Sequence, residues 1–272
     1  SSARTRYTTH GRGGMSKNKD VSWLAFSCVH APLHDPEAVD WLCGQIAKEQ
    51  PDFVIHLGDG MEMAWASSHA DLEDIDCIDE YEAHNKILAQ IRKASPDSKR
   101  IFLPGNHEWR LHSPSIDSRV RNALHWARHQ PEFEHWDTPI KYENCRHRGV
   151  FRLGQVVFCH GFATSHSAIR KEVCSLAREY GLYVHGHTHR PTQPGPPERI
   201  KGGVSWPLNW WVANPGCLRD LSPDWASKCD KTLWGQGCVV GRSQLLNSPR
   251  VRKCWEATTR VFRTYDEWSG SR

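Results

Sequence analysis

Residues 21–30 read VSWLAFSCVH, an apolar run that ends in a cysteine and a histidine. The run Val21–Ser27 has the length and the aromatic and β-branched content of a buried strand. A helix is predicted next, over Glu37–Glu49, because apolar residues recur there on one helical face. A second apolar run, Phe53–Leu57, leads directly into Gly58-Asp59. These segments predict a strand, helix, strand unit, which is typical of an α/β fold.

Apolar runs and amphipathic stretches continue to alternate along the chain, and a strand-rich region follows near its end. Further helices are predicted over Tyr81–Lys93, Ser115–His129 and Ser167–Tyr180, the last capped by Gly181, and further strands over Arg100–Leu103, Val150–Leu153, Val156–Cys159, Leu182–Val184, Trp210–Ala213, Gly237–Val240 and Thr258–Phe262. The stretch 191–207 is rich in proline and glycine, which predicts a surface loop with neither helix nor central strand. Ligands in such layered α/β folds collect where strands end.

Length and composition limit the class of protein. The chain has 272 residues, of which 38% are hydrophobic and 24% charged, and its net charge is +4, from 35 Lys and Arg less 31 Asp and Glu. These values predict one folded domain over residues 21–272 after a flexible basic tail over residues 1–20. The sequence contains no apolar run of the roughly 18 residues that cross a membrane, and its ten cysteines contain no C-x-x-C pair. We therefore expect a cytoplasmic protein with reduced thiols and no membrane partner, and the oligomeric state has no signature in the sequence.

Five predicted strands end in side chains that bind metal ions. The segments are Ser27-Cys28-Val29-His30, Gly58-Asp59, Gly105-Asn106-His107-Glu108, Cys159-His160-Gly161 and His185-Gly186-His187-Thr188-His189. Residues two apart on an extended segment point the same way, so Cys28 pairs with His30 and His187 with His189. A lone Gly-Asp-Gly is more often a turn, and a lone His107 or His160 is more often a structural histidine, whereas the Gly-His-Thr-His run is by itself a stronger indication of metal binding. The five segments in order, each after a strand, indicate a metal centre.

The types of donor restrict the metal. Imidazole, thiolate and carboxylate groups suit Zn, Fe or Mn, whereas Ca and Mg sites are built from oxygen atoms. Seven ligands exceed the four of one tetrahedral site. Two ions about 3.5 to 4 Å apart that share a carboxylate fit this number better, and such pairs are used in phosphoryl chemistry.

The order Cys28-x-His30, Gly58-Asp59, Gly105-Asn106-His107-Glu108, His160-Gly161, Gly186-His187-x-His189 resembles the motif set of the calcineurin-like metallophosphoesterase superfamily. The resemblance covers about Leu24 to Asn214. The forms GNHEWR and HGHTHRP are similar to those of phage and bacterial phosphoesterases, so a bacterial or phage-encoded protein is expected. The resemblance implies a four-layer αββα sandwich, in which helices flank two mixed β-sheets.

The resemblance also implies a role for each motif residue. One metal would be held by Cys28, His30, Asp59 and His189, and the second by Asp59, Asn106, His160 and His187, with Asp59 as the bridge. A hydroxide between the ions would attack phosphorus in line. His107 would donate a proton to the leaving oxygen or stabilise the transition state, with Glu108 or another carboxylate to orient it.

Cys28 departs from the family pattern, which has aspartate at this position. A metal-bound thiolate keeps the charge of −1 but is a softer donor, with a Zn–S distance near 2.3 Å. Zn or Fe is therefore favoured at the Cys28 position, and Mn, Zn or Fe at the other. Three outcomes stay open: a working centre with a changed metal preference, an oxidation-sensitive centre, or a weakened one.

Residues near the motifs allow more than one interpretation. Arg110 is close enough to His107 in sequence to bind a substrate phosphate, and a surface salt bridge is the alternative. Glu62 either hydrogen-bonds a ligand or is a solvated carboxylate. Asp35, which precedes Pro36, is expected to cap a helix.

The combined pattern predicts a dinuclear metal-dependent phosphoesterase. Phosphodiesters are the favoured substrates, and monoesters are further ones. A nuclease or nucleotide phosphodiesterase is one specific form of this prediction, and a protein phosphatase is another. The alternative is a non-catalytic metal-binding or redox-sensitive member of the fold, which Cys28 alone supports. His107 favours the enzyme, because a binding module needs no group to assist a leaving oxygen.

Overall fold

The computed structural model describes residues 20–67, 76–138, 149–176, 181–195, 210–221, 233–245 and 254–270. Residues 1–19 of the predicted basic tail lie outside this part of the chain, and Asp20 begins the first strand. Within the described residues, no helix has both the length and the apolar character required to cross a membrane.

The first sheet has five strands in the order β10-β9-β1-β2-β3. Their bounds are Asp20–Phe26 (β1), Phe53–His56 (β2), Lys99–Phe102 (β3), Gly235–Gln244 (β9) and Trp255–Thr264 (β10). Strands β1, β2 and β3 are parallel, whereas β9 and β10 run antiparallel to their neighbours. The register pairs Phe26 with His56 and His56 with Phe102, so the three parallel strands end at one edge of the sheet.

The second sheet has the strand order β4-β5-β6-β8-β7. Its strands are Val150–Leu153 (β4), Val156–Cys159 (β5), Gly181–His185 (β6), Thr192–Gly195 (β7) and Trp210–Asn214 (β8). Strands β5, β6 and β8 are parallel, and β4 and β7 are antiparallel edge strands. Both sheets are therefore mixed, as predicted.

Helices cover the outer faces of the two sheets. The α-helices are Pro36–Glu49 (α1), Cys77–Ala94 (α2), Asn106–Trp109 (α3), Ser118–Ala123 (α4), His166–Leu176 (α5) and Tyr265–Gly270 (α6), and the 3-10 turns are Ala64–Ala66 (η1), Arg110–His112 (η2), Trp126–Arg128 (η3) and Pro131–His135 (η4). Asp35 caps α1, because its carboxylate accepts the backbone N–H groups of Glu37 and Ala38. The predicted cap is confirmed.

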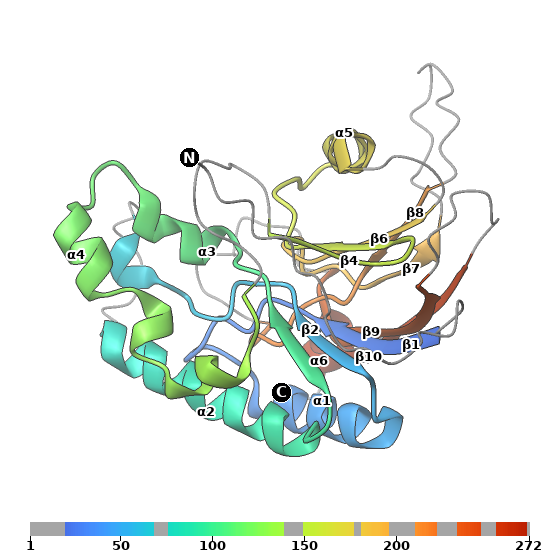
Figure 1. The fold of residues 1–272 in the computed structure, drawn as a ribbon, viewed down its shortest axis with the longest axis horizontal. Coiled ribbons are helices and arrows are strands. Elements are labelled where there is room, and N and C mark those ends of the chain that lie inside the picture. Colours follow the sequence, from blue (N-terminus) through green and yellow to red (C-terminus); the bar gives the residue numbers. More distant parts are fainter. Residues whose placement is uncertain are drawn as a thin grey trace, which may run out of the picture.

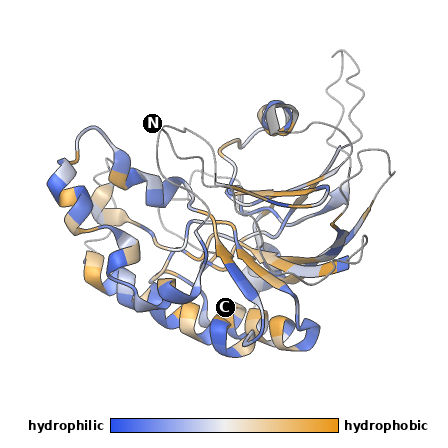
Figure 2. Cartoon of the chain, in the orientation of Figure 1, coloured by the Kyte–Doolittle hydropathy of each residue, from blue (hydrophilic) through white to orange (hydrophobic). Residues whose placement is uncertain are grey.

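Three apolar clusters separate four layers. Leu24, Phe26 and Val54 of the first sheet pack against α1 and α2 through one cluster. A second cluster lies between the two sheets, and a third places Val173 of α5 against the far face of the second sheet. Figure 1 shows α1 and α2 beyond one sheet and α5 beyond the other. Figure 2, in the same orientation, shows hydrophobic and hydrophilic residues alternating along α1 and α2. The predicted α/β sandwich of two mixed sheets flanked by helices is confirmed.

Three predicted elements differ in the structure. The helix predicted over Ser115–His129 is divided into α4 and η3 by His125, whose backbone is extended and whose side chain accepts the Ala127 N–H, and the Leu124 carbonyl before it accepts the Tyr81 hydroxyl at 2.7 Å. Gly181, predicted as a helix cap, begins β6, and a Cβ there would clash with the Gln155 carbonyl and the Trp210 ring. Residues 177–180, at the end of the helix predicted over Ser167–Tyr180, lie outside the described part. Of the predicted loop 191–207, Thr192–Gly195 forms edge strand β7, where a proline is tolerated, and residues 196–207 lie outside the described part.

Candidate metal centre

The predicted ligands lie in loops that follow strands of both sheets. Cys28 and His30 follow β1, Asp59 follows β2, Asn106 begins α3 after β3, His160 follows β5, and His187 and His189 follow β6. Contacts across the two sheets join these loops, since His30 meets His189, and Asn106 meets His160 and His187. The structure therefore brings all seven predicted ligands to one place, at the edge where the parallel strands end.

Five of the ligands have a left-handed backbone: Cys28 (φ 56°), His30 (φ 52°), Asp59 (φ 52°), His187 (φ 67°) and His189 (φ 59°). Side chains other than glycine rarely adopt this conformation. Among the other described residues that are not glycine, only Gln50 and Met63 share it. Such strain gathered in one set of polar side chains is typical of a functional site.

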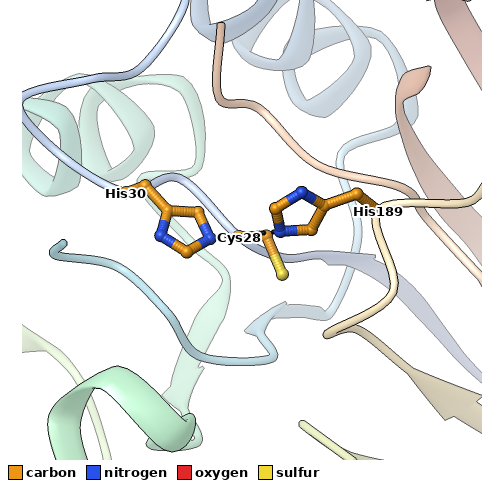
Figure 3. A group of neighbouring side chains, drawn as sticks. All are labelled: Cys28, His30 and His189. Atoms are coloured by element: carbon orange, nitrogen blue, oxygen red, sulfur yellow. Dashed lines mark hydrogen bonds between the residues drawn. The ribbon is translucent and has the colours of Figure 1, made fainter. Parts of the chain in front are cut away.

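Cys28, His30 and His189 form the first group of donors. Their donor atoms lie within 4.8 Å of one another, and all three side chains are buried. Figure 3 shows the two imidazole rings on either side of the Cys28 side chain. His30 Nδ1 is 2.9 Å from Glu62 Oε2, so we assign the imidazole proton to Nδ1. His30 Nε2 then directs its lone pair at His189 Nε2, 3.2 Å away.

The Cys28 sulfur has two polar neighbours. Ser27 Oγ lies 2.8 Å from it, and the backbone N–H of His187 donates to it at 3.3 Å. Burial, reinforced by the charge of Asp59, raises the pKa of the Cys28 thiol well above its usual range. A cation at this place would offset both effects, because a coordinating thiol is deprotonated outright.

Asp59, Asn106, His160 and His187 form the second group. Asn106 Oδ1 lies 3.0 Å from His160 Nε2 and 2.8 Å from His187 Nδ1. Asp59 Oδ2 lies 3.1 Å from His160 Nε2 and 3.9 Å from His30 Nε2. Asp59 is thus the residue that faces histidines of both groups.

The donor atoms of the second group direct lone pairs at one another, an arrangement that a cation between them would stabilise. His160 Nδ1 is 2.8 Å from the Leu57 carbonyl, so the imidazole proton lies on Nδ1. Its Nε2 lone pair then faces two oxygen acceptors, which is unfavourable in a buried site unless a proton or a metal lies between them. Burial opposes protonation of His160, but Asp59 outweighs it and raises the pKa. The donors of both groups are those that bind Zn, Fe or Mn.

Glu108 holds the loop that carries Asp59. Its carboxylate accepts the backbone N–H groups of Gly105 at 2.6 Å, Gly60 at 2.9 Å and Asp59 at 3.0 Å. Burial and the charge of Asp59 raise the pKa of Glu108 to about 7, against the effect of these N–H groups. Of the two predicted ways to orient His107, Glu108 is excluded because its oxygens are directed to the backbone; the other carboxylate nearby is that of Glu62, whose Oε1 lies 3.8 Å from His107 Nδ1.

His107 is oriented by a backbone carbonyl. His107 Nδ1 is 2.6 Å from the Glu62 carbonyl oxygen, and its Nε2 faces Asp59 Oδ2 at 4.0 Å. Burial lowers the pKa of His107 to about 3. Arg110 lies beside it, with Nη2 3.2 Å from His107 Nε2 and Nη1 2.6 Å from the Glu62 carbonyl oxygen. Arg110 is thus bound to the backbone and adjoins His107, and its Nη1 is 4.0 Å from the nearer Glu62 carboxylate oxygen.

Glu62 and Arg219 complete the surroundings of the site. The buried Glu62 carboxylate accepts both His30 Nδ1–H and, at 3.0 Å, an N–H of the buried Arg219. Glu62 therefore hydrogen-bonds a predicted ligand, and the interpretation as a solvated carboxylate is wrong. Sequence reasoning missed Arg219, which lies 157 residues away and has no local motif around it.

Comparisons with solved structures show low identity over most of each chain. A Vps29 mutant from Entamoeba histolytica is 9% identical, covering 89% of this chain and 99% of that chain, with a TM-score of 0.41. The phosphoesterase YfcE from E. coli is 12% identical, covering 86% and 98%, with a TM-score of 0.37. Vacuolar protein sorting 29 from Cryptosporidium parvum is 12% identical, covering 90% and 99%, with a TM-score of 0.41. No curated protein matches the chain.

A family profile gives a direct assignment. The profile described as calcineurin-like phosphoesterase matches residues 23–191, more than half of the chain, and the matched part contains all seven predicted ligands. Members of the family bind two divalent metal ions, and the described residues contain candidate metal-binding groups such as Cys28, His30 and His189. The chain belongs to the calcineurin-like phosphoesterase family.

Proposed function

We propose that the protein is a dinuclear metal-dependent phosphodiesterase. The observation that carries the proposal is the convergence of two donor groups on Asp59, whose Oδ2 lies 3.1 Å from His160 Nε2 and 3.9 Å from His30 Nε2. Cys28, His30 and His189 would hold one ion and Asn106, His160 and His187 the other, with Asp59 between them. When bound, the two ions supply an activated water and positive charge for the phosphoryl group.

Cys28 determines which metal the first group prefers. A thiolate is a softer donor than the aspartate of the family pattern, so Zn or Fe would be favoured there, and Mn, Zn or Fe in the second group. The Ser27 hydroxyl and the His187 N–H next to the sulfur would stabilise its negative charge.

His107 would act on the leaving oxygen. The Glu62 carbonyl accepts its Nδ1–H and so directs Nε2 toward Asp59 and the metal ligands. Burial keeps the free imidazole neutral, with its pKa lowered to about 3. The charge of a bound phosphoester would offset this burial and let Nε2 hold the proton that the leaving oxygen needs.

Arg110 would bind a phosphate oxygen. Its guanidinium lies beside His107 Nε2 and is held by the Glu62 and Met63 carbonyls. Within the described residues, no other cationic side chain forms a hydrogen bond with His107. One cation suits the single charge of a diester better than the double charge of a monoester. Nucleic acid, a nucleotide or another diester would serve as substrate, in the cytoplasm of a bacterium or a phage host.

Hydrolysis of chromogenic esters tests the proposal. The purified protein would be assayed for bound metal and for hydrolysis of bis(p-nitrophenyl) phosphate and p-nitrophenyl phosphate, with and without added Zn, Fe or Mn. We expect faster diester hydrolysis, which His107→Ala lowers at least a hundredfold without loss of metal, because general acid catalysis contributes about 10²–10⁴-fold. His135→Ala is the matched control, since His135 is exposed.

A non-catalytic or redox-sensitive metal-binding protein is the second candidate. The observation in its favour is the buried Cys28 thiol in place of a carboxylate. If the protein binds two ions per chain and hydrolyses neither ester with any of the three metals, the phosphodiesterase proposal fails and this candidate replaces it.

A further inference from the structure

The described residues contain a third group of donors next to the two that would hold metal. His30, Glu62 and His107 offer three buried donor atoms within 4.8 Å of one another. His30 is shared with the first group, in which Cys28 and His189 lie close to it. His30 can bind a metal ion through Nε2 together with Cys28 and His189, or through Nδ1 together with Glu62 and His107. The surroundings of the His30 ring therefore influence which of the two groups binds the ion.

Arg219 contacts the carboxylate of Glu62, which belongs to the third group. Its Nη1 is 3.0 Å from Glu62 Oε2, and the same oxygen is 2.9 Å from His30 Nδ1. Arg219 and Glu62 each have only 2% of their surface exposed. A carboxylate oxygen that already accepts an arginine N–H and an imidazole N–H is poorly placed to bind a cation as well, and the guanidinium repels one.

The backbone on both sides of Arg219 is hydrogen-bonded to the loop after β1, which carries Cys28 and His30. Leu218 N–H donates to the Cys28 carbonyl at 3.0 Å, and Asp220 N–H donates to the Leu33 carbonyl at 3.0 Å. The Arg219 carbonyl accepts the Gln236 side chain at 2.8 Å. The residues on both sides of Arg219 are thus bonded to the segment that carries Cys28 and His30.

We propose that Arg219 is a positioning residue that keeps the Glu62 carboxylate on His30 Nδ1, and so directs metal to Cys28, His30 and His189 and away from His30, Glu62 and His107. The inference rests on the proposed metal centre and adds to it a residue beyond the matched region 23–191. With Nδ1–H donated to Glu62, His30 has only Nε2 available as a ligand atom. The third group stays free of metal, and His107 stays available for the leaving oxygen.

Cobalt binding gives a test that does not depend on activity. Metal-free parent protein is titrated with Co²⁺, and the near-ultraviolet sulfur-to-cobalt charge-transfer band reports coordination by Cys28. In Arg219→Gln we expect about ten- to a hundredfold weaker binding in the sulfur band, the range found when outer partners of metal ligands are removed. We also expect additional cobalt that is bound without sulfur absorption. Arg219→Lys retains the charge and should recover part of the affinity.

Two further variants keep the test decisive. Arg242→Gln is the matched control, because Arg242 is exposed on β9, and it should titrate like the parent. Arg219→Gln with Glu62→Gln leaves no buried carboxylate in the third group, so the sulfur-silent cobalt that Arg219→Gln binds beyond that of the parent should disappear. This double variant also removes both charges of the buried pair, and it replaces the single variant if that one fails to fold.

The outcomes separate this inference from the proposed function. If folded Arg219→Gln shows the parent's sulfur-band affinity and stoichiometry, or if the double variant keeps more sulfur-silent cobalt than the parent, the role of Arg219 is refuted. If the parent binds cobalt through Cys28 but hydrolyses no ester, the proposed function fails and the role of Arg219 stands. A parent without any sulfur band refutes both.

Discussion

Substitution of Glu108 by glutamine tests how the Asp59 loop is held. The Glu108 carboxylate accepts backbone N–H groups with both oxygens: Oε2 from Gly105 and Asp59, and Oε1 from Gly60 at 2.9 Å and Met61 at 3.4 Å. Glutamine has one oxygen, and its NH₂ group cannot accept. Whichever way the amide lies, it leaves one of the two pairs of N–H groups without an acceptor.

The expected loss of stability follows from these bonds. A hydrogen bond to a charged group contributes about 1.5–3 kcal/mol, and a buried donor left unpaired costs about 1–3 kcal/mol. Loss of one pair would therefore cost about 4 kcal/mol. Part of this cost is offset because the neutral amide, unlike the carboxylate, requires no desolvation of a charge when it is buried. We expect the free energy of unfolding of metal-free Glu108→Gln to fall by about 3 kcal/mol.

Urea denaturation at pH 8 measures this loss, because Glu108, with its pKa raised to about 7, is then mostly ionised. The control is Glu134→Gln, which changes an exposed carboxylate of η4 and should alter stability by less than about 0.5 kcal/mol. If Glu108→Gln loses less than about 1 kcal/mol, the four N–H contacts do not hold the loop, and Glu108 is not its anchor.

Three further changes probe the ligands and the core. Cys28→Asp should retain metal but shift its preference toward Mn, as metal analysis after competition would show, and an unchanged metal profile would contradict a ligand role for Cys28. Asn106→Ala should lose one of the two ions and keep the one with Cys28, which metal counts per chain would reveal; two retained ions would contradict the second group. Burial lowers the pKa of His84 from its usual 6.5 to about 4. The unfolded chain therefore takes up a proton on His84 at a higher pH than the folded chain, and stability is lost as the pH falls from 6.5 toward 4. Between pH 7 and pH 5 the parent should lose about 2 kcal/mol more than His84→Gln, by urea denaturation at both values, and equal losses would contradict the buried neutral histidine.

The strand ends could be predicted because their signal is local. In each of the five segments an apolar run is followed at once by metal-binding residue types, and parallel strands bring such ends to one edge of a sheet. The helix predicted over Ser115–His129 failed for the opposite reason. At its interruption the Leu124 carbonyl binds the Tyr81 hydroxyl, 43 residues earlier, and no local pattern contains this contact.

Residues around the ligands were harder to assign from the sequence. Glu108 follows His107 directly, but consecutive residues of a helix point in different directions. In α3, Glu108 reaches back to the N–H of Gly105, three residues earlier, which is one half of a capping box, because Gly105 has no side chain to form the other half. A glutamate three residues after a helix start was thus the available signal. Arg219 had none, because its contact with Glu62 joins distant parts of the chain.

Backbone strain explains why these anchors accompany the ligands. A left-handed conformation costs roughly 1–2 kcal/mol for a residue other than glycine, so the five strained ligands together store about 5–10 kcal/mol. This is comparable with the whole net stability of an ordinary domain, about 5–15 kcal/mol. The loops therefore hold their shape only because buried groups fix them: Glu108 fixes Asp59, the Glu62 and Arg219 pair fixes His30, and Leu218 fixes Cys28. Metal binding and folding stability must be coupled through these contacts, so a variant that releases one anchor should weaken both.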